Sequence, residues 1–477
     1  MVTGPNPAII WDNKQVMAVS ARSSLARSAA FEILLRIERE GSYASELLHS
    51  AALSSLSPRD HGLATELVMG VLRWRSVLDK RIAGAASQKL ERMDDEVLAA
   101  LRLGVYQLKF LTRVPARAAI FESVELVKAA RKRSAAPFVN AVLRKIAESV
   151  ADDVFAEINQ SPDSITLAQS AAHPPWLVER WVSQYGIEAT RQICIHDQTV
   201  PGTAIRIHDD QSDDRQTNPE LATAGLELAP GRLLSGARCV LAGDVTTTRA
   251  YQEGRVSIQD EASQLVALLV GRGEVILDCC AAPGSKTALL ARRNPRAKVF
   301  ATELHPHRAR LLESLSRVAN VFVVAADARR LPFSSVIGFD RILADVPCSG
   351  TGTLSRNPEI KWRLKKEDLK DLQSRQVAIL KSALGQLAIG GRLVYSTCSL
   401  EREENEAVVE AAVESTTQFY VSDLKDELEH LRKSGELSSE LAAKDKGIVS
   451  LLSGPYLRTI PGVHPCDGFF AALIERR

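Results

Sequence analysis

The sequence predicts a multidomain protein with an all-α N-terminal domain, an α+β connecting subdomain and a larger α/β C-terminal domain. Three observations lead to this prediction. At roughly 100–200 residues per domain, the 477 residues allow two to four domains. Helical periodicity runs through the first 150 residues, and after residue 270 short apolar runs alternate with helical segments. A composition of 45% hydrophobic and 25% charged residues is ordinary for globular domains.

We expect a cytoplasmic protein without membrane-spanning segments. The longer apolar runs, 265–270 and 321–326, are shorter than the roughly 18 residues that a spanning helix needs, and the first residues lack the basic and apolar regions of a secretory signal. The seven cysteines are an odd number without C-x-x-C pairs, which argues against a disulfide framework and against a zinc cluster. They are Cys194, Cys239, Cys279, Cys280, Cys348, Cys398 and Cys466.

The region 23–150 is expected to be helical throughout, after an N-terminal tail at residues 1–22. Asp94 stands where one helix would begin, and Pro137 divides the stretch 118–145 into two helices. Apolar residues recur at the spacing of one helical face in three places: Ala30, Ile33, Leu34 and Ile37; Ala64, Leu67, Val68, Val71 and Leu72; and Leu98, Leu101, Val105 and Leu108. This region is therefore predicted to be a helical bundle.

The helical region is also where the basic charge lies. Residues 21–150 hold 21 Lys and Arg against 14 Asp and Glu, although the net charge of the whole chain is only +2. The densest part is formed by Arg113, Arg117, Lys128, Arg131, Lys132, Arg133, Arg144 and Lys145, with Glu122 and Glu125 as its acidic residues. Such a surface suits a polyanion such as RNA, and the alternative is a solvated helical face without a partner.

The connecting subdomain is predicted at residues 151–250. It begins with a polar joint at 151–163 and continues with a short helix at 176–185 and β-like pieces at 203–207 and 239–241. In the C-terminal domain, strands are expected at 275–280, 298–302, 321–325, 341–345 and 392–396, with helices at 286–293, 307–317 and 366–388. This alternation predicts a parallel sheet covered on both faces, with its ligand at the carboxyl ends of the strands.

The first three strand ends carry features of a nucleotide site. The first strand ends in a small-residue turn, DCCAAPGSKT at 278–287, which leads into a helix whose N-terminus favours an anionic group. Glu303 ends the second strand, where an acid can accept hydrogen bonds from ribose hydroxyls, and Asp327 follows the third. Acids at strand ends also serve as helix N-caps, so these features alone indicate only a nucleotide site of some kind.

The fourth and fifth strand ends carry Asp345, Cys348 and Cys398. A lone cysteine is more often a small buried residue, but thiols on Ser, Thr and Gly turns before helix N-termini are placed for a lowered pKa and for reactivity. The combination of two cysteines and an aspartate beside a nucleotide turn therefore predicts a catalytic site.

Three segments, LDCCAAPGSKT, ADVPCSGTGTLSRNPEIKW and YSTCSLEREENE, resemble the signatures of the RNA cytosine-C5 methyltransferases, which use S-adenosylmethionine on a Rossmann-like sheet. In the N-terminal third, LLRIEREGSYASELL, SPRDHGLATELVMGVLRWRSVLDKRI and FVNAVLRKI are similar to the NusB-like helical RNA-binding domain. Together they resemble the RsmB class, also called Sun or Fmu, of small-subunit (16S) ribosomal RNA methyltransferases. The resemblance implies a NusB-like domain at 23–150, an RNA-binding connecting subdomain at 151–250 and a class I S-adenosylmethionine-dependent methyltransferase domain at 251–477.

The resemblance also implies roles for individual residues. Cys398 is implied as the nucleophile and Cys348 as the residue that helps product release, while Asp345 would stabilise the charge that develops on addition if it contacts the N3/N4 edge of the cytosine. Glu303 stands where Asp is common in the family, Ser285 stands where Gly is common, and neither change removes the needed chemistry. The implied cofactor site consists of Cys280, Ala281, Ala282, Pro283, Gly284, Ser285, Lys286, Glu303, Asp327 and Asp345. The polar stretch 425–446 looks like a surface insertion without an evident role.

The implied reaction is methylation of carbon 5 of a specific cytosine in 16S rRNA through a covalent bond between cysteine and carbon 6. The implied partner is RNA with an unpaired cytosine in a hairpin loop, bound by a monomer without a membrane or a metal. Three alternatives stay open: the same chemistry on transfer RNA, the DNA-methyltransferase arrangement in which the Pro-Cys cysteine is the nucleophile, and a non-catalytic RNA-binding factor. A Rossmann dehydrogenase is disfavoured because the first turn lacks G-x-G-x-x-G.

Overall fold

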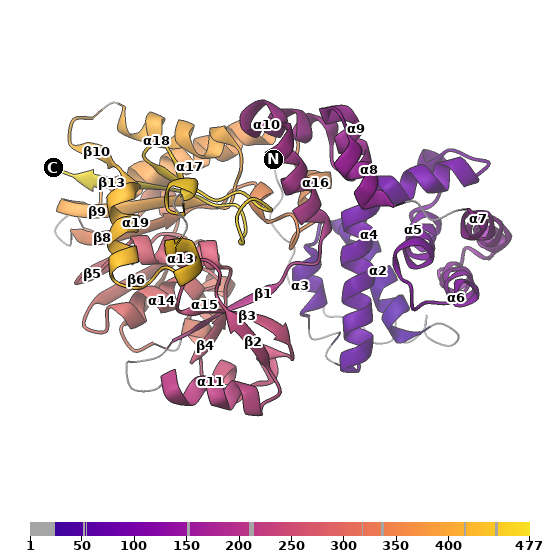
Figure 1. Ribbon diagram of the computed structural model, residues 1–477, viewed down its shortest axis with the longest axis horizontal. Coiled ribbons are helices and arrows are strands. Elements are labelled where there is room, and N and C mark those ends of the chain that lie inside the picture. The colour runs from indigo at the N-terminus through magenta and orange to yellow at the C-terminus, as the bar shows by residue number, and fades with distance from the viewer. Residues whose placement is uncertain are drawn as a thin grey trace. The chain divides into compact units, whose positions relative to one another are not determined.

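The computed structural model describes residues 24–50, 53, 55–149, 153–208, 214–316, 318–334, 338–414, 416–443 and 447–477 (Figure 1). The chain divides into two compact units. One, the helical unit, consists of Met1–Gln198 together with Ser355–Trp362, and the other, the sheet unit, consists of Thr199–Leu354 together with Arg363–Arg477. Each unit is described by itself.

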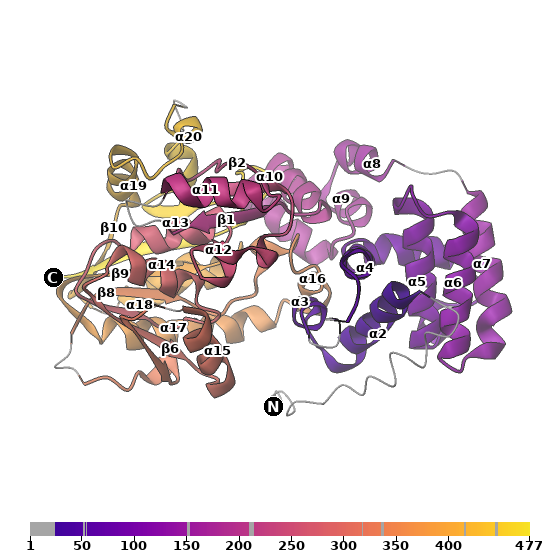
Figure 2. The same ribbon diagram turned by 90° about the horizontal axis from the view of Figure 1, so that it is seen from below.

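The helical unit is built from helices that bury one apolar face each, with α5, α6 and α7 packed side by side (Figure 2). Its helices are α2 (Leu25–Glu40), α3 (Ala44–Leu48), α4 (Pro58–Ala85), α5 (Asp95–Phe110), α6 (Ala116–Ala129), α7 (Ala136–Glu148), α8 (Val154–Gln160), α9 (Ser164–Ser170) and α10 (Pro175–Gln198). Leu67, Leu101 and Leu143 are fully buried at their interfaces. Helices α4 and α5 approach closely because Gly70 has no side chain: a Cβ there would lie 1.9 Å from the Tyr106 ring.

The predicted all-α N-terminal domain is confirmed. Two predictions for the residues that follow it, the polar joint at 151–163 and the short helix at 176–185, are wrong. Asp94 is the residue before α5, and Pro137 lies in the first turn of α7. The predicted polar joint at 151–163 contains helix α8, because Val154 and Ile158 are buried one helical turn apart. The helix predicted at 176–185 continues as α10 to Gln198, and its break at Gly186, with φ 80°, lies inside the longer helix.

An eight-residue segment from the C-terminal half of the chain, Ser355–Trp362, belongs to the helical unit. Arg73 donates from Nη2 to the Ser355 carbonyl at 2.9 Å, and Lys361 Nζ donates to the Arg73 carbonyl at 2.9 Å. Trp362 Nε1 donates to the Leu72 carbonyl at 2.7 Å. Lys361 is 1% exposed, and this burial lowers its pKa to about 7. The sequence did not predict this insertion.

The sheet unit begins with a small antiparallel sheet of order β2-β3-β1-β4. Its elements are β1 (Thr203–Ile207), α11 (Asp214–Thr223), β2 (Glu227–Pro230), β3 (Ala237–Ala242), α12 (Arg249–Gln252) and β4 (Val256–Ile258). Ile205, Leu221 and Val256 form part of its core. Strands β1 and β3 lie where the sequence predicted β-structure.

The main sheet has nine strands, ordered β11-β12-β13-β9-β8-β5-β6-β7, with β10 paired to β13. They are β5 (Val275–Asp278), β6 (Lys298–Glu303), β7 (Val321–Ala325), β8 (Phe339–Asp345), β9 (Leu387–Thr397), β10 (Phe419–Ser422), β11 (Leu452–Ser453), β12 (Tyr456–Arg458) and β13 (Phe470–Arg476). The first five are the predicted parallel strands, and the last four pair antiparallel. The predicted parallel sheet is therefore one part of a mixed sheet, because the C-terminal strands return without crossover helices.

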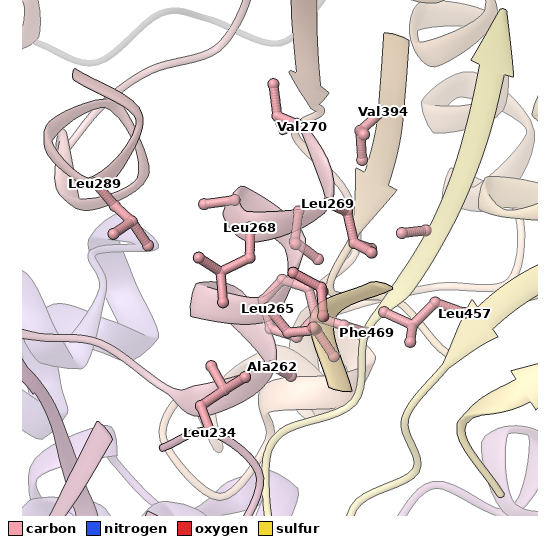
Figure 3. Close-up of a cluster of buried hydrophobic side chains, with 14 of the residues drawn as sticks. Leu234, Ala262, Leu265, Leu268, Leu269, Val270, Leu289, Val394, Leu457 and Phe469 are labelled. Atoms are coloured by element: carbon pink, nitrogen blue, oxygen red, sulfur yellow. The ribbon is translucent and has the colours of Figure 1, made fainter. Parts of the chain in front are cut away.

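Helices cover both faces of this sheet, as predicted. Successive residues point to opposite faces, so Ile276 packs with α13 (Glu261–Leu269) and α14 (Ser285–Arg293), while Leu277 packs with α17 (Asp368–Leu384) and α18 (Glu406–Val413). Helix α15 (Pro306–Ser316) joins β6 to β7, and α16 (Ile360–Arg363) lies at the end of the inserted segment. Figure 3 shows the first of these cores, in which Leu265 of α13 faces Phe469 and neighbouring Leu and Val side chains.

The prediction that 425–446 is a surface insertion was wrong. It contains most of α19 (Leu424–Lys433) and α20 (Ser439–Ala443), and Leu424, Leu428 and Leu431 of α19 are buried at helical spacing. Leu437 forms a β-bridge with Leu234, and Glu436 lies 3.6 Å from Arg206. The segment thus joins the small sheet to the main sheet. None of the helices described in the structure has the length and hydropathy to cross a membrane.

Candidate active site at the strand ends

The turn after β5 leads directly into the N-terminus of α14. Gly284 has φ +116°, a conformation that residues with a Cβ rarely adopt, and a Cβ there would lie 2.6 Å from Leu312 of α15. The first turn of α14 directs backbone N–H groups toward the end of β5, where they favour an anionic group. Burial raises the pKa of the Cys280 thiol well above its ordinary value, so this thiol is neutral. The turn from Cys280 to Lys286 can therefore bind a carboxylate.

Two carboxylates follow at the next strand ends. Glu303 is 6% exposed at the end of β6, where its Oε1 accepts a hydrogen bond of 3.0 Å from the His305 N–H. Asp327 follows β7, caps the Arg329 N–H at 2.9 Å and forms an ion pair of 2.6 Å with the Arg329 side chain. The Arg329 hydrogen bonds hold the pKa of Asp327 below its ordinary value. The sequence did not predict the Arg329 contact.

Lys286 and Asp345 form an ion pair between the first and fourth strand ends. Lys286 Nζ lies 2.7 Å from Asp345 Oδ2, and Ser396 Oγ donates to Asp345 Oδ1 at 2.7 Å. Burial by itself lowers the pKa of Lys286, but the Asp345 carboxylate outweighs burial and raises it above the ordinary value. The ammonium also lies over the Phe469 ring, 5.4 Å from its centroid. Lys286 is therefore a fixed positive charge in the site.

The two cysteines meet next to this ion pair. The sulfur atoms of Cys348 and Cys398 are 3.3 Å apart, and both residues are partly exposed. The hydrogen bond to Cys398, burial and the nearby Glu404 and Asp345 carboxylates raise the pKa of Cys348 well above its ordinary value. The prediction of a lowered pKa was therefore wrong for Cys348, because its surroundings are buried and acidic. Cys348 is the partner that keeps its proton.

Sequence reasoning missed the residue that connects the two cysteine turns, Glu404. Its carboxylate accepts a hydrogen bond of 2.8 Å from the Ser349 N–H and one of 2.5 Å from Ser399 Oγ. Ser349 directly follows Cys348, and Ser399 directly follows Cys398. The repeated Cys-Ser dipeptide, with an acid six residues after the second cysteine, was the available signal.

The structure thus holds two contacting pairs, Lys286 with Asp345 and Cys348 with Cys398, near enough for the charges of one pair to influence the other. Glu303 and Asp327 lie at the carboxyl ends of β6 and after β7, on the same edge of the sheet. Across the described ranges, no group of three or more His, Cys, Asp or Glu residues has the arrangement of a metal site. The groups present are an anion-binding turn, three carboxylates, a lysine and two thiols.

Family models match three parts of the chain. Residues 265–475 match the model described as 16S rRNA methyltransferase RsmB/F, and residues 24–148 match the NusB family. Residues 173–242 match the ferredoxin-like domain of RsmF/B-like methyltransferases. These matches cover the sheet, the helical bundle and the small antiparallel sheet.

Relatives match over nearly their whole length. The chain is 33% identical over 466 residues to the probable ribosomal RNA small subunit methyltransferase B of Bacillus subtilis, covering 96% of this chain and 100% of that protein. It is 30% identical over 460 residues to ribosomal RNA small subunit methyltransferase B of Vibrio cholerae, covering 94% and 97%. Among solved structures, PH0851 has the same fold, with a TM-score of 0.74 at 23% identity over 98% of this chain and 100% of that chain. NSun6 from Pyrococcus horikoshii, with a TM-score of 0.52 at 20% identity, is similar in fold over 62% of this chain and 97% of that chain.

Proposed function

The chain belongs to the 16S rRNA methyltransferase family RsmB/F and is an RNA methyltransferase that uses S-adenosylmethionine, and we propose that it methylates carbon 5 of one unpaired cytosine in small-subunit rRNA. The observation that supports this most directly is the 3.3 Å between the Cys348 and Cys398 sulfur atoms, beside the Lys286–Asp345 pair. A nucleophile for carbon 6 and charged groups for the polar edge of the ring are what cytosine-C5 chemistry requires.

The residues present fit the cofactor. The turn from Cys280 to Lys286 would hold its methionine end, because a carboxylate suits the N-terminus of α14. Glu303 would accept hydrogen bonds from the ribose hydroxyls, and Asp327 would accept one from the adenine amino group. When bound, S-adenosylmethionine supplies an electrophilic methyl group next to the cysteines.

Cys398 is proposed as the nucleophile that activates the base. Carbon 5 of cytosine is a poor nucleophile until a thiolate adds to carbon 6. The sulfur–carbon bond forms, and the electron pair of the C5–C6 double bond becomes available at carbon 5. Addition of the thiolate develops negative charge on the N3 side of the ring. Asp345 would accept a hydrogen bond from the N4 amino group, and the Lys286 ammonium, 2.7 Å from that carboxylate, would stabilise the negative charge.

Cys348 is proposed to act in product release. After methyl transfer a base removes the proton on carbon 5, the C5–C6 double bond re-forms, and the bond between carbon 6 and sulfur breaks with its electron pair returning to Cys398. The hydrogen bond and charge of Cys398 raise the pKa of Cys348 in the free site. In the covalent adduct the Cys398 sulfur carries no charge, so Cys348 loses its proton more readily at the step that needs a base.

The substrate is proposed to be a hairpin-loop cytosine, because a base stacked in a duplex cannot reach a thiol. The exposed arginines of α6, α7, the turn between them and the loop before α6 would bind the phosphates around it. Arg113, Arg117, Arg131, Arg133 and Arg144 are exposed, and none makes an ion pair with a described residue.

The test is methyl transfer from labelled S-adenosylmethionine to unmodified 16S rRNA and to transfer RNA, with wild type, Cys398→Ala and Cys348→Ala in parallel. We expect 5-methylcytosine at one unpaired position of 16S rRNA and no product with Cys398→Ala. With Cys348→Ala we expect an RNA–protein adduct that survives denaturing electrophoresis.

Each other outcome overturns a specific part of the proposal. Label only in transfer RNA would keep the chemistry and discard the substrate. Full activity of Cys398→Ala would make Cys348 the nucleophile. Methylation at another atom of the base would remove the covalent step.

A further inference from the structure

We infer that Glu404 is a positioning residue of the reaction: its carboxylate holds the two cysteine-bearing turns at the separation that lets Cys348 serve Cys398. The inference rests on the proposed roles of the two cysteines. It goes beyond them by naming the group that sets their geometry and by locating it outside the cofactor site.

Four donors converge on this one carboxylate. Oε1 accepts hydrogen bonds from the Ser349 N–H at 2.8 Å and from Gln376 Nε2 at 2.9 Å. Oε2 accepts hydrogen bonds from Ser399 Oγ at 2.5 Å and from the Ser349 hydroxyl. Glu404 is fully buried, so these donors replace water for both oxygens.

The contacts of Glu404 act on the cysteines through the adjacent peptides. Ser349 and Ser399 are 8% and 1% exposed, and their hydroxyl oxygens are 3.1 Å apart. Each follows its cysteine across one planar peptide, so a shift of the serine moves the cysteine backbone with it. The buried serines therefore fix the backbone of the two turns, and this in turn fixes the positions of the partly exposed cysteines.

Glu404 is itself held rigidly. Tyr395 Oη donates to the Glu404 carbonyl at 2.5 Å. The neighbouring Asn405 accepts from Thr397 Oγ1 at 2.6 Å and donates from Nδ2 to the Ser399 carbonyl at 2.9 Å. These bonds connect the residue to β9, the strand that precedes Cys398.

The site calls for a carboxylate because every group facing it donates. A glutamine at this position has one oxygen and one amino group, so its N–H would face a donor on at least one side. Glu404→Gln therefore keeps the size of the side chain but loses a hydrogen bond to one of the two turns. It also removes a negative charge that helps to keep the proton on Cys348.

The first measurement needs no RNA. In a Cys398→Ala background, the rate at which iodoacetamide alkylates Cys348 is followed against pH, with and without Glu404→Gln. We expect the midpoint of this profile to move to lower pH with Glu404→Gln, because the nearby negative charge is gone. Glu261→Gln is the matched control, since Glu261 is 2% exposed and accepts three backbone N–H bonds far along the chain from both turns.

The second measurement is catalytic. With Glu404→Gln in the otherwise native chain, we expect kcat to fall about tenfold or more, which is the effect of losing a hydrogen bond to a charged group, with KM for RNA unchanged. The covalent adduct should accumulate as it does with Cys348→Ala. In Cys348→Ala/Glu404→Gln the second change should add little, because both act on the same release step.

Unchanged alkylation profiles together with an unchanged adduct fraction would overturn the inference. If the wild-type protein formed no 5-methylcytosine, the proposed function would be wrong. The alkylation measurement would still test the role of Glu404, because it does not depend on activity. If Glu404→Gln did not fold, Ser349→Ala and Ser399→Ala would replace it. Each removes one hydroxyl donor to Glu404, and each should raise the adduct fraction less than Cys348→Ala does.

Discussion

The two active-site cysteines follow neighbouring strands of one sheet but lie in different electrostatic surroundings. The hydrogen bond to Cys398, burial and the nearby carboxylates of Glu404 and Asp345 raise the pKa of Cys348. Cys398 lies near Lys286, and the charge of Cys398 is among the influences that raise the pKa of that lysine. The surroundings therefore favour a proton on Cys348 and place a positive charge near Cys398, which agrees with the proposed division of labour between them.

Asp278, at the end of β5, gives a prediction about pH. Burial raises its pKa to about 6, and Thr287 Oγ1 donates to its Oδ2 at 2.7 Å. Because the folded state holds this proton more tightly than the unfolded state, the contribution of Asp278 to stability is full below about pH 4 and is lost as the pH rises through 6, by roughly 3 kcal/mol. Asp278→Asn should therefore stabilise β5 relative to wild type at pH 7 and lose most of that advantage by pH 4.5.

Hydrogen exchange of peptides from β5, compared between wild type and variant at each pH, measures this difference. Asp340→Asn serves as the control, because Asp340 accepts hydrogen bonds from the N–H groups of Glu274 and Val275 at the other end of the same strand. A difference between Asp278→Asn and wild type that stays constant from pH 4.5 to 7 would contradict the prediction.

At the residue scale, the sequence motifs predicted which residues form the site. They did not predict how these residues pair or how they change one another's pKa. The turns carrying Cys348 and Cys398 could be read from the sequence because small and polar residues surround each thiol. The direction of the Cys348 pKa could not, because it depends on the contact with Cys398, on burial and on Glu404, which is 56 positions away along the chain. The Lys286–Asp345 ion pair could not be predicted from the sequence either, since it joins residues from two different strand ends.

Among the elements, three turns pack against one another behind the cysteines. The Gly352 N–H donates to the Cys398 carbonyl at 2.9 Å, and the Gly468 N–H donates to the Gly352 carbonyl at 2.8 Å. A Cβ on Gly352 would lie 2.2 Å from the Gly468 carbonyl oxygen. Backbone atoms cannot rotate away as a side chain can, so one turn must move.

Gly352→Ala is therefore expected to lower kcat by roughly tenfold or more by displacing the Cys398 turn, since small misplacements of reacting groups are costly. Steady-state methyl transfer together with thermal unfolding checks this. Gly385→Ala is the control, because Gly385 has helical backbone angles and its Cβ would meet nothing closer than 3.4 Å. Equal activities of the two variants would show that the turns adjust without effect.

The inserted segment Ser355–Trp362 gives a second pH prediction. Burial lowers the pKa of Lys361 to about 7, whereas the unfolded value is 10.5. The contribution of Lys361 to stability is thus full above about pH 10.5 and is lost as the pH falls through 7, so the free energy of unfolding should rise by as much as about 3 kcal/mol between pH 7 and 9. Lys361→Met should remove that rise.

Tryptophan fluorescence during urea unfolding measures this effect in the helical unit, because the tryptophans that the structure describes, Trp74, Trp176, Trp181 and Trp362, belong to that unit. Lys366→Met is the matched control, since Lys366 is exposed five positions further along. A pH dependence in Lys361→Met equal to that of wild type would show that Lys361 does not carry it.

For the whole molecule, the sequence predicted the order of the domains and the five parallel strands, because buried parallel strands are nearly continuous apolar runs. It did not predict the four antiparallel strands at the C-terminus. Of these, β11 and β12 are two and three residues long, too short to show alternation. It also missed α19, because its three buried leucines are surrounded by charged residues. Long-range packing determines both the antiparallel strands and α19.

The basic surface of the helical unit gives a prediction about the intact protein and RNA. Lys132 is partly neutralised, since its Nζ lies 3.0 Å from Asp94, whereas Arg131 and Arg133 are exposed. Arg131 has φ 62°, so asparagine is the replacement that tolerates its backbone. If both arginines contact phosphates, Arg131→Asn/Arg133→Gln should reduce the slope of log affinity against log salt by about 1.4, or about 0.7 for each contact with single-stranded RNA.

Affinity for a 16S rRNA hairpin, measured from 50 to 300 mM salt, checks this slope. Arg59→Gln is the control: Arg59 is exposed in the first turn of α4, and Lys145 of the basic region contacts the last turn of that helix, roughly 40 Å away at 1.5 Å per residue. The control should leave the slope unchanged. Because phosphate contacts carry no sequence information, the double variant should lose affinity equally for hairpins with and without the target cytosine. An unchanged slope would make the basic face a solvated surface and leave substrate binding to the sheet unit.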